Sequence, residues 1–284
     1  MNEEYLQTLQ LGEACVTILT LALLRWDLEQ QMPIPRQERP ARYAHLFEQP
    51  SQVPVRCVHI SLPGVSLLVD ACTSTAFLGT EYEQPGAPVY PDLLDQLASA
   101  GVSAEEITHV VITHHHFDHI IGLTRKQGEV FVPCFPRARH YLGHADWEVA
   151  SVQEALGRPD SVVHSTLAVL QHQGLLELVD GDHDLGHGLR ILHTPGETPG
   201  HQILRLEADG HTLYCLGDLY HHLVEIEQPT WMAPWDDSAT MLPSRQRLTQ
   251  AALAENALLV AAHIPTVGGL GVTADGVCWE ARTL

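Results

Sequence analysis

Histidine and aspartate side chains are concentrated in one short stretch of the chain, Thr113-His114-His115-His116-Phe117-Asp118-His119. His114 and His116 are two residues apart, so in extended backbone their side chains leave on the same side and can share one metal ion. Asp118 and His119 are adjacent and diverge, so they can reach a second ion nearby. Imidazole nitrogen and carboxylate oxygen together suit zinc best, with iron, manganese or cobalt as alternatives.

The elements around this stretch indicate where it lies in the fold. An apolar run rich in valine and isoleucine, residues 107–112, precedes it, and Gly122 follows it. Such a run predicts a buried strand. The histidines then lie where a strand ends and the chain turns, which is a usual place for functional groups on an open α/β sheet. A histidine-rich surface turn that binds no metal is the alternative.

The motif His-x-His-x-Asp-His resembles the signature of the metallo-β-lactamase-fold hydrolase superfamily, in which a histidine, a bridging aspartate and a histidine follow in that order. For these three positions the resemblance implies His201 after Thr-Pro-Gly-Glu-Thr-Pro-Gly, Asp218 after Leu216-Gly217, and His263 in Ala-Ala-His-Ile-Pro. Each of them follows or ends an apolar segment. The resemblance extends over most of the chain.

The resemblance implies a metal centre and a mechanism. It implies two Zn²⁺ ions, or other divalent ions, held by seven side chains: His114, His116 and His201 for one ion, Asp118, His119 and His263 for the other, and Asp218 for both. A hydroxide that bridges the two ions would be the nucleophile, and Asp118 would pass a proton to the leaving group. The sequence contains no Gly-x-Ser-x-Gly motif, which argues against an α/β-hydrolase.

Within the superfamily, the sequence is most similar to the acyl-homoserine lactonase and methyl-parathion-hydrolase-like group. Asp218 counts against a true zinc β-lactamase, and His116 counts against an oxygen-reducing di-iron member. The segment after His263 is too short for the C-terminal domain of a glyoxalase. We therefore expect a hydrolase of small apolar esters or lactones, with acyl-lactones favoured. The alternatives are hydrolysis of phosphotriesters or aryl esters at the same site, and a non-catalytic metal-stabilised binding protein.

Several residues are candidates for contact with the substrate. Lactonases of this group often have a tyrosine shortly after the bridging aspartate that hydrogen-bonds the substrate carbonyl, so the resemblance implies a catalytic role for Tyr220. His221 or His222 is the alternative, because Tyr220 is two residues after Asp218 and not three. Aromatic side chains can line an apolar pocket or can be ordinary core residues; the candidates are Phe117, Trp231 and Trp235. Asp70, at the end of a predicted strand, either supports the metal site or caps a turn.

The composition restricts the partners and the location. The net charge is −20 at pH 7, which repels nucleic acid and anionic membranes. The start of the chain lacks a basic segment, and the longest apolar stretch, residues 14–24, is too short to span a bilayer. Six scattered cysteines without a Cys-x-x-Cys motif suggest a reducing compartment. We therefore expect a cytoplasmic protein with a small-molecule substrate, no nucleic acid or membrane partner, and a possible homodimer.

The remaining pattern predicts strands and helices in two halves. Hairpins are expected over residues 6–24 and 55–70, strands over 175–179, 189–193, 203–206, 212–216, 258–262 and 277–279, and helices over 91–100, 145–156, 161–170 and 245–254. Residues 27–54 contain five prolines and form a long Pro-rich loop, either a flap beside the active site or a plain surface loop. We expect one domain over residues 1–284 of the α+β class. The resemblance implies a four-layer αβ/βα sandwich with the metals between the sheets.

Overall fold

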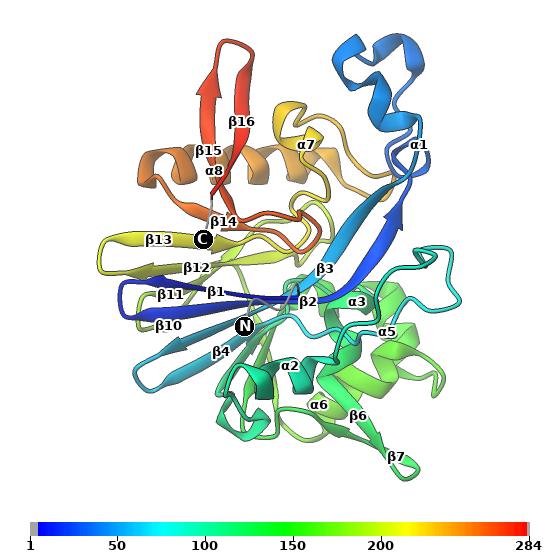
Figure 1. The fold of residues 1–284 in the computed structure, drawn as a ribbon. Helices are drawn as coiled ribbons and strands as arrows, with labels where there is room; N and C mark the ends of the chain where they lie inside the picture. The colour runs from blue at the N-terminus through cyan, green and yellow to red at the C-terminus, as the bar shows by residue number, and fades with distance from the viewer. Residues whose placement is uncertain (1–4, 283–284) are drawn as a thin grey trace.

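Two seven-stranded sheets form the centre of the protein (Figure 1). The computed structural model describes residues 5–282. The first sheet contains, in spatial order, β1 Leu6–Leu11, β2 Ala14–Trp26, β3 Ser51–Leu62, β4 Val65–Val69, β5 His109–Val111, β8 Arg139–Gly143 and β9 Leu176–Val179. The second contains β10 His183–Gly186, β11 Leu189–His193, β12 Gln202–Ala208, β13 His211–Cys215, β14 Leu258–Val260, β15 Gly268–Thr273 and β16 Gly276–Ala281. A separate ribbon pairs β6 Thr124–Gln127 with β7 Val130–Pro133.

Short helices and one long helix complete the fold. The helices are α1 Leu28–Gln31, α2 Leu93–Ser99, α3 Phe117–Ile120, α4 His144–Trp147, α5 Ala150–Leu156, α6 Val169–His172, α7 Val224–Glu227 and α8 Ser238–Glu255. A π-helical turn, His164–Ala168, leads into α6, and 3₁₀ turns cover Arg36–Glu38, Ala41–Phe47, Ala104–Glu106 and Ile121–Leu123. In Figure 1, α8 lies against the second sheet, and α2, α5 and α6 lie on the side of the first sheet.

Three apolar clusters show how these layers are held together. One lies between the sheets, where Ile18 and Ile60 of the first sheet pack with Leu204 and Leu213 of the second. The second joins the outer face of the first sheet to its helices, and the third joins the outer face of the second sheet to α8. A strand that is covered on both faces has a nearly continuous apolar sequence, as β2 does. This arrangement confirms the predicted α+β, four-layer αβ/βα fold.

Some element boundaries differ from the predictions for local reasons. Helix α8 begins at Ser238, before the predicted start at Arg245, because the Asp237 side chain caps it by accepting a hydrogen bond from Ala239 N at 3.1 Å. Strand β15 lies in a glycine-rich stretch for which no strand was predicted. Its glycines are needed there: a Cβ on Gly268 would lie 2.3 Å from the Trp279 ring of the paired strand β16.

Residues 27–54 contain more structure than a loop. They hold α1, two 3₁₀ turns and the first residues of β3. Residues 27–54 pack against the loop around Trp231, whose ring is 5.5 Å from that of Tyr43. No residue of the segment is among those that line the cavity described below. Its contacts therefore favour a structural role over a flap.

Two histidines of the first sheet, His59 on β3 and His140 on β8, are buried away from the metal-binding residues. Burial disfavours the charged imidazolium and lowers the pKa of each to about 4. The unfolded chain, with a histidine pKa of about 6.5, therefore binds protons that the folded chain does not. The folded protein therefore has its full stability above about pH 6.5, where these histidines are neutral in both states. Its free energy of unfolding decreases as the pH falls from about 6.5 towards 4.

We expect the free energy of unfolding to decrease between about pH 6.5 and pH 4, by up to about 3 kcal/mol for each of these two histidines. A His140→Leu variant, which has no group to protonate there, should lose less stability over this range than the wild type. Urea unfolding of both proteins in the presence of a chelator, at several pH values, measures the difference. Parallel losses in the two proteins would show that His140 does not cause the decrease.

Candidate metal centre

Four loops that follow strands of the two sheets meet at one end of the sandwich. They are the motif loop after β5, the Thr194–His201 loop before β12, the Gly217–His222 loop after β13, and the loop after β14 that carries His263. Gly217 lets two of them touch. It has a φ of +51°, and a Cβ there would lie 2.7 Å from the Thr113 side chain. The sequence thus brings widely separated side chains into one cluster.

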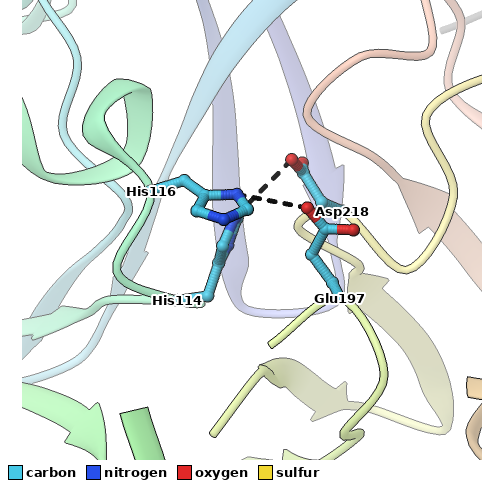
Figure 2. Close-up of side chains that lie close together, drawn as sticks. All are labelled: His114, His116, Glu197 and Asp218. Atoms are coloured by element: carbon cyan, nitrogen blue, oxygen red, sulfur yellow. Dashed lines mark ion pairs between the residues drawn. The ribbon is translucent and has the colours of Figure 1, made fainter. Parts of the chain in front are cut away.

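The first group of possible ligands contains His114, His116 and Asp218, as predicted, and also Glu197, which was not predicted (Figure 2). One nitrogen or oxygen atom of each lies within 4.8 Å of the others. His114 Nε2 is 3.7 Å from Asp218 Oδ2, and His116 Nδ1 is 3.1 Å from Glu197 Oε1. A carboxylate four residues before His201 was the available sequence signal for Glu197.

The second group contains Asp118, His119 and His263. Asp118 Oδ2 is 3.6 Å from His119 Nε2 and 3.5 Å from His263 Nε2. Asp218 lies between the two groups, because its Oδ2 is also 3.2 Å from His119 Nε2 and its Oδ1 is 3.3 Å from His263 Nε2. A single carboxylate can therefore contact both groups at once.

His201 lies beside the first group without belonging to it. Its ring centroid is 5.3 Å from that of His114, and its Nε2 accepts a hydrogen bond from Asp218 N at 3.2 Å. Its Nδ1 is held by Thr194, at 2.9 Å from Oγ1 and 3.1 Å from the carbonyl oxygen. The ring is oriented towards Asp218, and its role as a ligand remains a prediction.

The residues of both groups fit divalent cations. Within residues 5–282, His114 Nε2, His119 Nε2 and Asp218 Oδ1 are buried and have no hydrogen-bond partner. In the ion pairs of residues 5–282, no lysine or arginine contacts Asp118, Asp218 or Glu197. Buried carboxylates without a cation are costly, and nitrogen and oxygen donors at these spacings suit zinc.

The electrostatics of the two groups favour positive charge at the carboxylates. Burial and the neighbouring histidines His119 and His116 lower the pKa of His114 well below its usual value. Burial opposes protonation of His119 too, yet Asp218 and Asp118 raise its pKa well above the usual value. Although burial has the opposite effect, His119 and His263 hold the pKa of Asp218 well below its range. Bound cations would replace these protons.

Asp70 positions the motif loop, residues 113–119, through its side chain. Its backbone has a φ of +59°, which aspartate tolerates better than most residues. The carboxylate accepts hydrogen bonds from Thr113 N at 2.7 Å and Thr113 Oγ1 at 2.9 Å, and contacts His119 Nδ1 at 2.8 Å. A proton on His119 Nδ1 leaves Nε2 free to face Asp218. These contacts are the ones expected of a side chain that orients a ligand.

Asp146 joins the motif loop to the His201 loop, a role that the sequence did not reveal. The fully buried carboxylate accepts hydrogen bonds from His115 N at 2.9 Å and Gly200 N at 2.6 Å. Gly200 is needed for this approach, because a Cβ there would lie 2.4 Å from Asp146 N.

We expect Asp146→Ala to lower the free energy of unfolding by about 3 kcal/mol, because two buried N–H groups lose their acceptor. Asp146→Asn should cost less, since its amide oxygen still accepts one of these hydrogen bonds. Urea unfolding measures both changes, with Asp160→Ala on the exposed surface as the control. An Asp146→Ala variant as stable as this control would contradict the role.

A cavity of about 240 Å³ opens above the two groups. Its polar lining consists of His116, Asp118, Glu197, Asp218, His221 and His263. Its apolar lining consists of Leu24, Trp26, Phe77, Tyr82, Phe117 and Trp235. Three of the predicted substrate contacts, Phe117, His221 and Trp235, are therefore at the cavity. The contributions of Trp26 and Tyr82 come from the far end of β2 and the segment that pairs with it, which no local pattern indicated.

The predicted contact between Tyr220 and the substrate is not supported by the structure. The tyrosine is buried under α8, with its hydroxyl 3.5 Å from Thr249 Oγ1, and it does not line the cavity. In extended backbone Tyr220 would leave on the same side as Asp218. The chain instead turns at this point, with Leu219 N bonded to Leu216 O at 3.2 Å.

His222 and Trp231 also lie away from the cavity. His222 Nδ1 accepts a hydrogen bond from Val224 N at 3.1 Å, at the start of α7. Trp231 packs edge-on against Tyr43 and Phe47, with ring centroids 5.5 and 5.8 Å away. Both side chains have structural contacts, so the predicted contacts with the substrate are not supported for these two residues.

Comparison with known proteins agrees with the fold and the clusters of possible ligands. The chain belongs to the metallo-beta-lactamase superfamily, whose sequence profile matches residues 53–263. It is 26% identical over 173 residues to an N-acyl homoserine lactonase of Bacillus sp, a match that covers 60% of this chain and 61% of that protein. It is 30% identical over 185 residues to a hydroxyacylglutathione hydrolase of Aeromonas salmonicida (strain A449), covering 63% and 55%. The matched segment thus spans about three fifths of these curated relatives.

Solved structures share the whole fold. The hydrolase AbOPH of the beta lactamase superfamily superposes with a TM-score of 0.81 at 18% identity, covering 100% of this chain and 99% of that one. AidC, described as a dizinc quorum-quenching lactonase, superposes with a TM-score of 0.77 at 22% identity, covering 99% of each chain. The predicted superfamily is confirmed. In the described part of the chain, no helix combines the length and apolar character of a membrane span.

Proposed function

We propose that this protein is a metal-dependent hydrolase of small apolar esters or lactones, with acyl-lactones as the leading substrates and two divalent cations, zinc favoured, as cofactors. The observation that carries the proposal is the position of Asp218 between two groups of possible ligands at the base of a partly apolar cavity. The similarity to N-acyl homoserine lactonases supports the choice of lactones.

The residues around the cavity have different roles in the proposed hydrolysis. The cations, when bound, supply Lewis acidity for the substrate carbonyl and lower the pKa of water. Asp118 lines both the cavity and the second group, so its carboxyl group can pass a proton to the leaving alkoxide. His221, with Nε2 3.5 Å from Asp218 Oδ2, faces the same space and takes the substrate-contact role first predicted for Tyr220. The apolar wall, including Trp26 and Phe117, holds the acyl group and excludes water.

A substrate panel tests this proposal. Protein loaded with zinc is assayed with an N-acyl homoserine lactone of long acyl chain, an aryl ester and an aryl phosphotriester. We expect the lactone to have the highest kcat/KM. If the protein hydrolyses the lactone slowly and the phosphotriester fast, phosphotriesters replace lactones as the proposed substrate class. If the protein binds metal but hydrolyses no substrate of the panel, the proposal of an enzyme is wrong, and a metal-stabilised binding protein takes its place.

We expect Tyr220→Phe to change kcat/KM for the lactone by less than about threefold, because its hydroxyl lies away from the cavity. His221→Ala serves as the comparison and should reduce kcat/KM by about tenfold or more. Steady-state kinetics of both variants measure the contrast. A large loss in Tyr220→Phe alone would restore the original prediction for the tyrosine.

The other expectations remain predictions. The cysteines suggest a cytoplasmic location, which stays a prediction, as does the possible homodimer. One domain over residues 1–284 is likewise a proposal, supported by the two sheets that share one core.

A further inference from the structure

Glu197 is a buried carboxylate that the proposed mechanism does not use. It lies in the Thr194–His201 loop, and its residue is 4% exposed. Its Oε1 accepts a hydrogen bond from Trp235 Nε1 at 2.8 Å and lies 3.1 Å from His116 Nδ1 and 3.6 Å from His221 Nε2. The side chain therefore faces the cavity and the first group of possible ligands together (Figure 2).

The spacing of Glu197 is that of a ligand. Two ligands at about 2.1 Å from a tetrahedral ion lie about 3.4 Å apart. The His116–Glu197 distance of 3.1 Å is close to this value. The distances from Asp218 to His114 and His119, 3.7 and 3.2 Å, bracket it. Glu197 thus occupies the same kind of position as the predicted ligands.

The charge around Glu197 points to a cation as well. Arg245 is engaged by Glu225 at 2.5 Å, and in the ion pairs of residues 5–282 no lysine or arginine contacts Glu197. The contacts of Oε1 with nitrogen atoms are those to the His116 and His221 rings and to the Trp235 indole N–H. A buried carboxylate in such surroundings is stable when it binds a metal ion.

We propose that Glu197 is an additional ligand of the first metal site, which it enters from the cavity side next to His116. This inference rests on the proposed function, since it requires that the two cations bind. An added carboxylate increases the negative charge of the first site, so that site should hold its cation more tightly and should accept oxygen-preferring ions such as manganese. The second site, around His263, should be unaffected.

Metal binding and cobalt spectra of four variants test the proposal. Glu197→Gln removes the charge with little change of shape, and Glu197→Asp keeps the charge but withdraws the oxygen. Trp235→Phe removes the hydrogen bond to Glu197 and keeps the carboxylate. Glu154→Gln, on the exposed face of α5, is the control for net charge. Zinc affinity is measured by competition with a chelator, and coordination is read from the visible spectrum of the cobalt(II)-substituted proteins.

We expect both Glu197 variants to lose about tenfold or more in affinity at one of two sites and to show a stronger cobalt absorption, as lower coordination numbers do. Glu154→Gln should stay within about threefold of the wild type, and Trp235→Phe, which keeps the carboxylate but loses its hydrogen bond, should lower the affinity less than Glu197→Gln does and leave the cobalt spectrum unchanged. Unchanged affinity in Glu197→Gln would overturn the proposal. So would a lower affinity with an unchanged cobalt spectrum, which would make Glu197 a positioning residue that acts through His116.

Two controls keep these outcomes separate. Thermal unfolding of the metal-free proteins shows whether the Glu197 variants fold; if Glu197→Gln does not, Glu197→Asp decides. If the wild type and the Glu197 variants bind two zinc ions equally well, only the role of Glu197 is refuted. A folded wild-type chain that binds no zinc, cobalt or manganese refutes the proposed function itself, and this inference with it.

Discussion

Asp218→Asn is expected to abolish nearly all hydrolysis and to release metal. Both carboxylate oxygens are used, since Oδ2 is 3.2 Å from His119 Nε2 and Oδ1 is 3.3 Å from His263 Nε2. Asparagine offers one neutral oxygen and an NH₂ group that repels a cation. We expect kcat/KM for the lactone to fall by about 10³-fold or more, equivalent to roughly 4 kcal/mol of transition-state stabilisation.

The measurement combines kinetics with metal content. Asp160→Asn, which removes the same charge on the exposed surface, is the control and should behave as the wild type. Metal content of the Asp218→Asn protein should fall below two per chain. An Asp218→Asn protein that keeps two metals and more than about a tenth of the activity would show that Asp218 does not join the two groups.

Arg245→Met is expected to give the largest loss of stability among the substitutions discussed for this protein. The guanidinium is buried, pairs with Glu225 at 2.5 Å, and donates to the carbonyl oxygens of Leu219 and Trp231 at 2.9 and 2.8 Å. Its removal leaves the Glu225 charge buried and unpaired, which costs about 3–5 kcal/mol. Glu225 in turn accepts hydrogen bonds from the backbone of the His221 loop, so the cavity wall should loosen too.

Urea unfolding measures this loss, and a double variant separates its causes. Arg245→Met with Glu225→Gln removes the unpaired charge while the amide oxygen can still accept from the backbone. We expect the double variant to recover about 1–2 kcal/mol relative to Arg245→Met. A double variant that is less stable than the single one would mean that the ion pair is not the main contribution of Arg245.

The sequence predicted the parts of the site that follow from local spacing. The motif loop, the strand before it and the placing of His263 after β14 depend on runs of adjacent residues, and these agree with the structure. The family resemblance supplied the four layers, which periodicity could not. Asp118 and His119, which are adjacent, reach the same group, because α3 begins at Phe117 and turns the chain there.

The features that the sequence missed depend on contacts between distant segments. Asp146 can join the two loops because Gly200, far along the chain, has no side chain at the point of contact. Trp26 reaches the cavity because β2 is long enough to extend to it. The resemblance implied a contact between Tyr220 and the substrate, but the chain turns at Leu219 and the tyrosine packs under α8, which the sequence could not show. Glu197 lies four residues before His201 in the sequence, but its closeness to His114, His116 and Asp218 is what marks it as a possible ligand.

In the proposed function, side chains from four loops hold two cations that hydrolysis requires. Titration of chelated, metal-free protein with zinc, with lactone hydrolysis followed at each addition, tests it most directly. We predict no turnover at the start and full activity when two equivalents per chain are bound. Turnover that survives chelation, or that saturates with no metal in the folded protein, would contradict the claim.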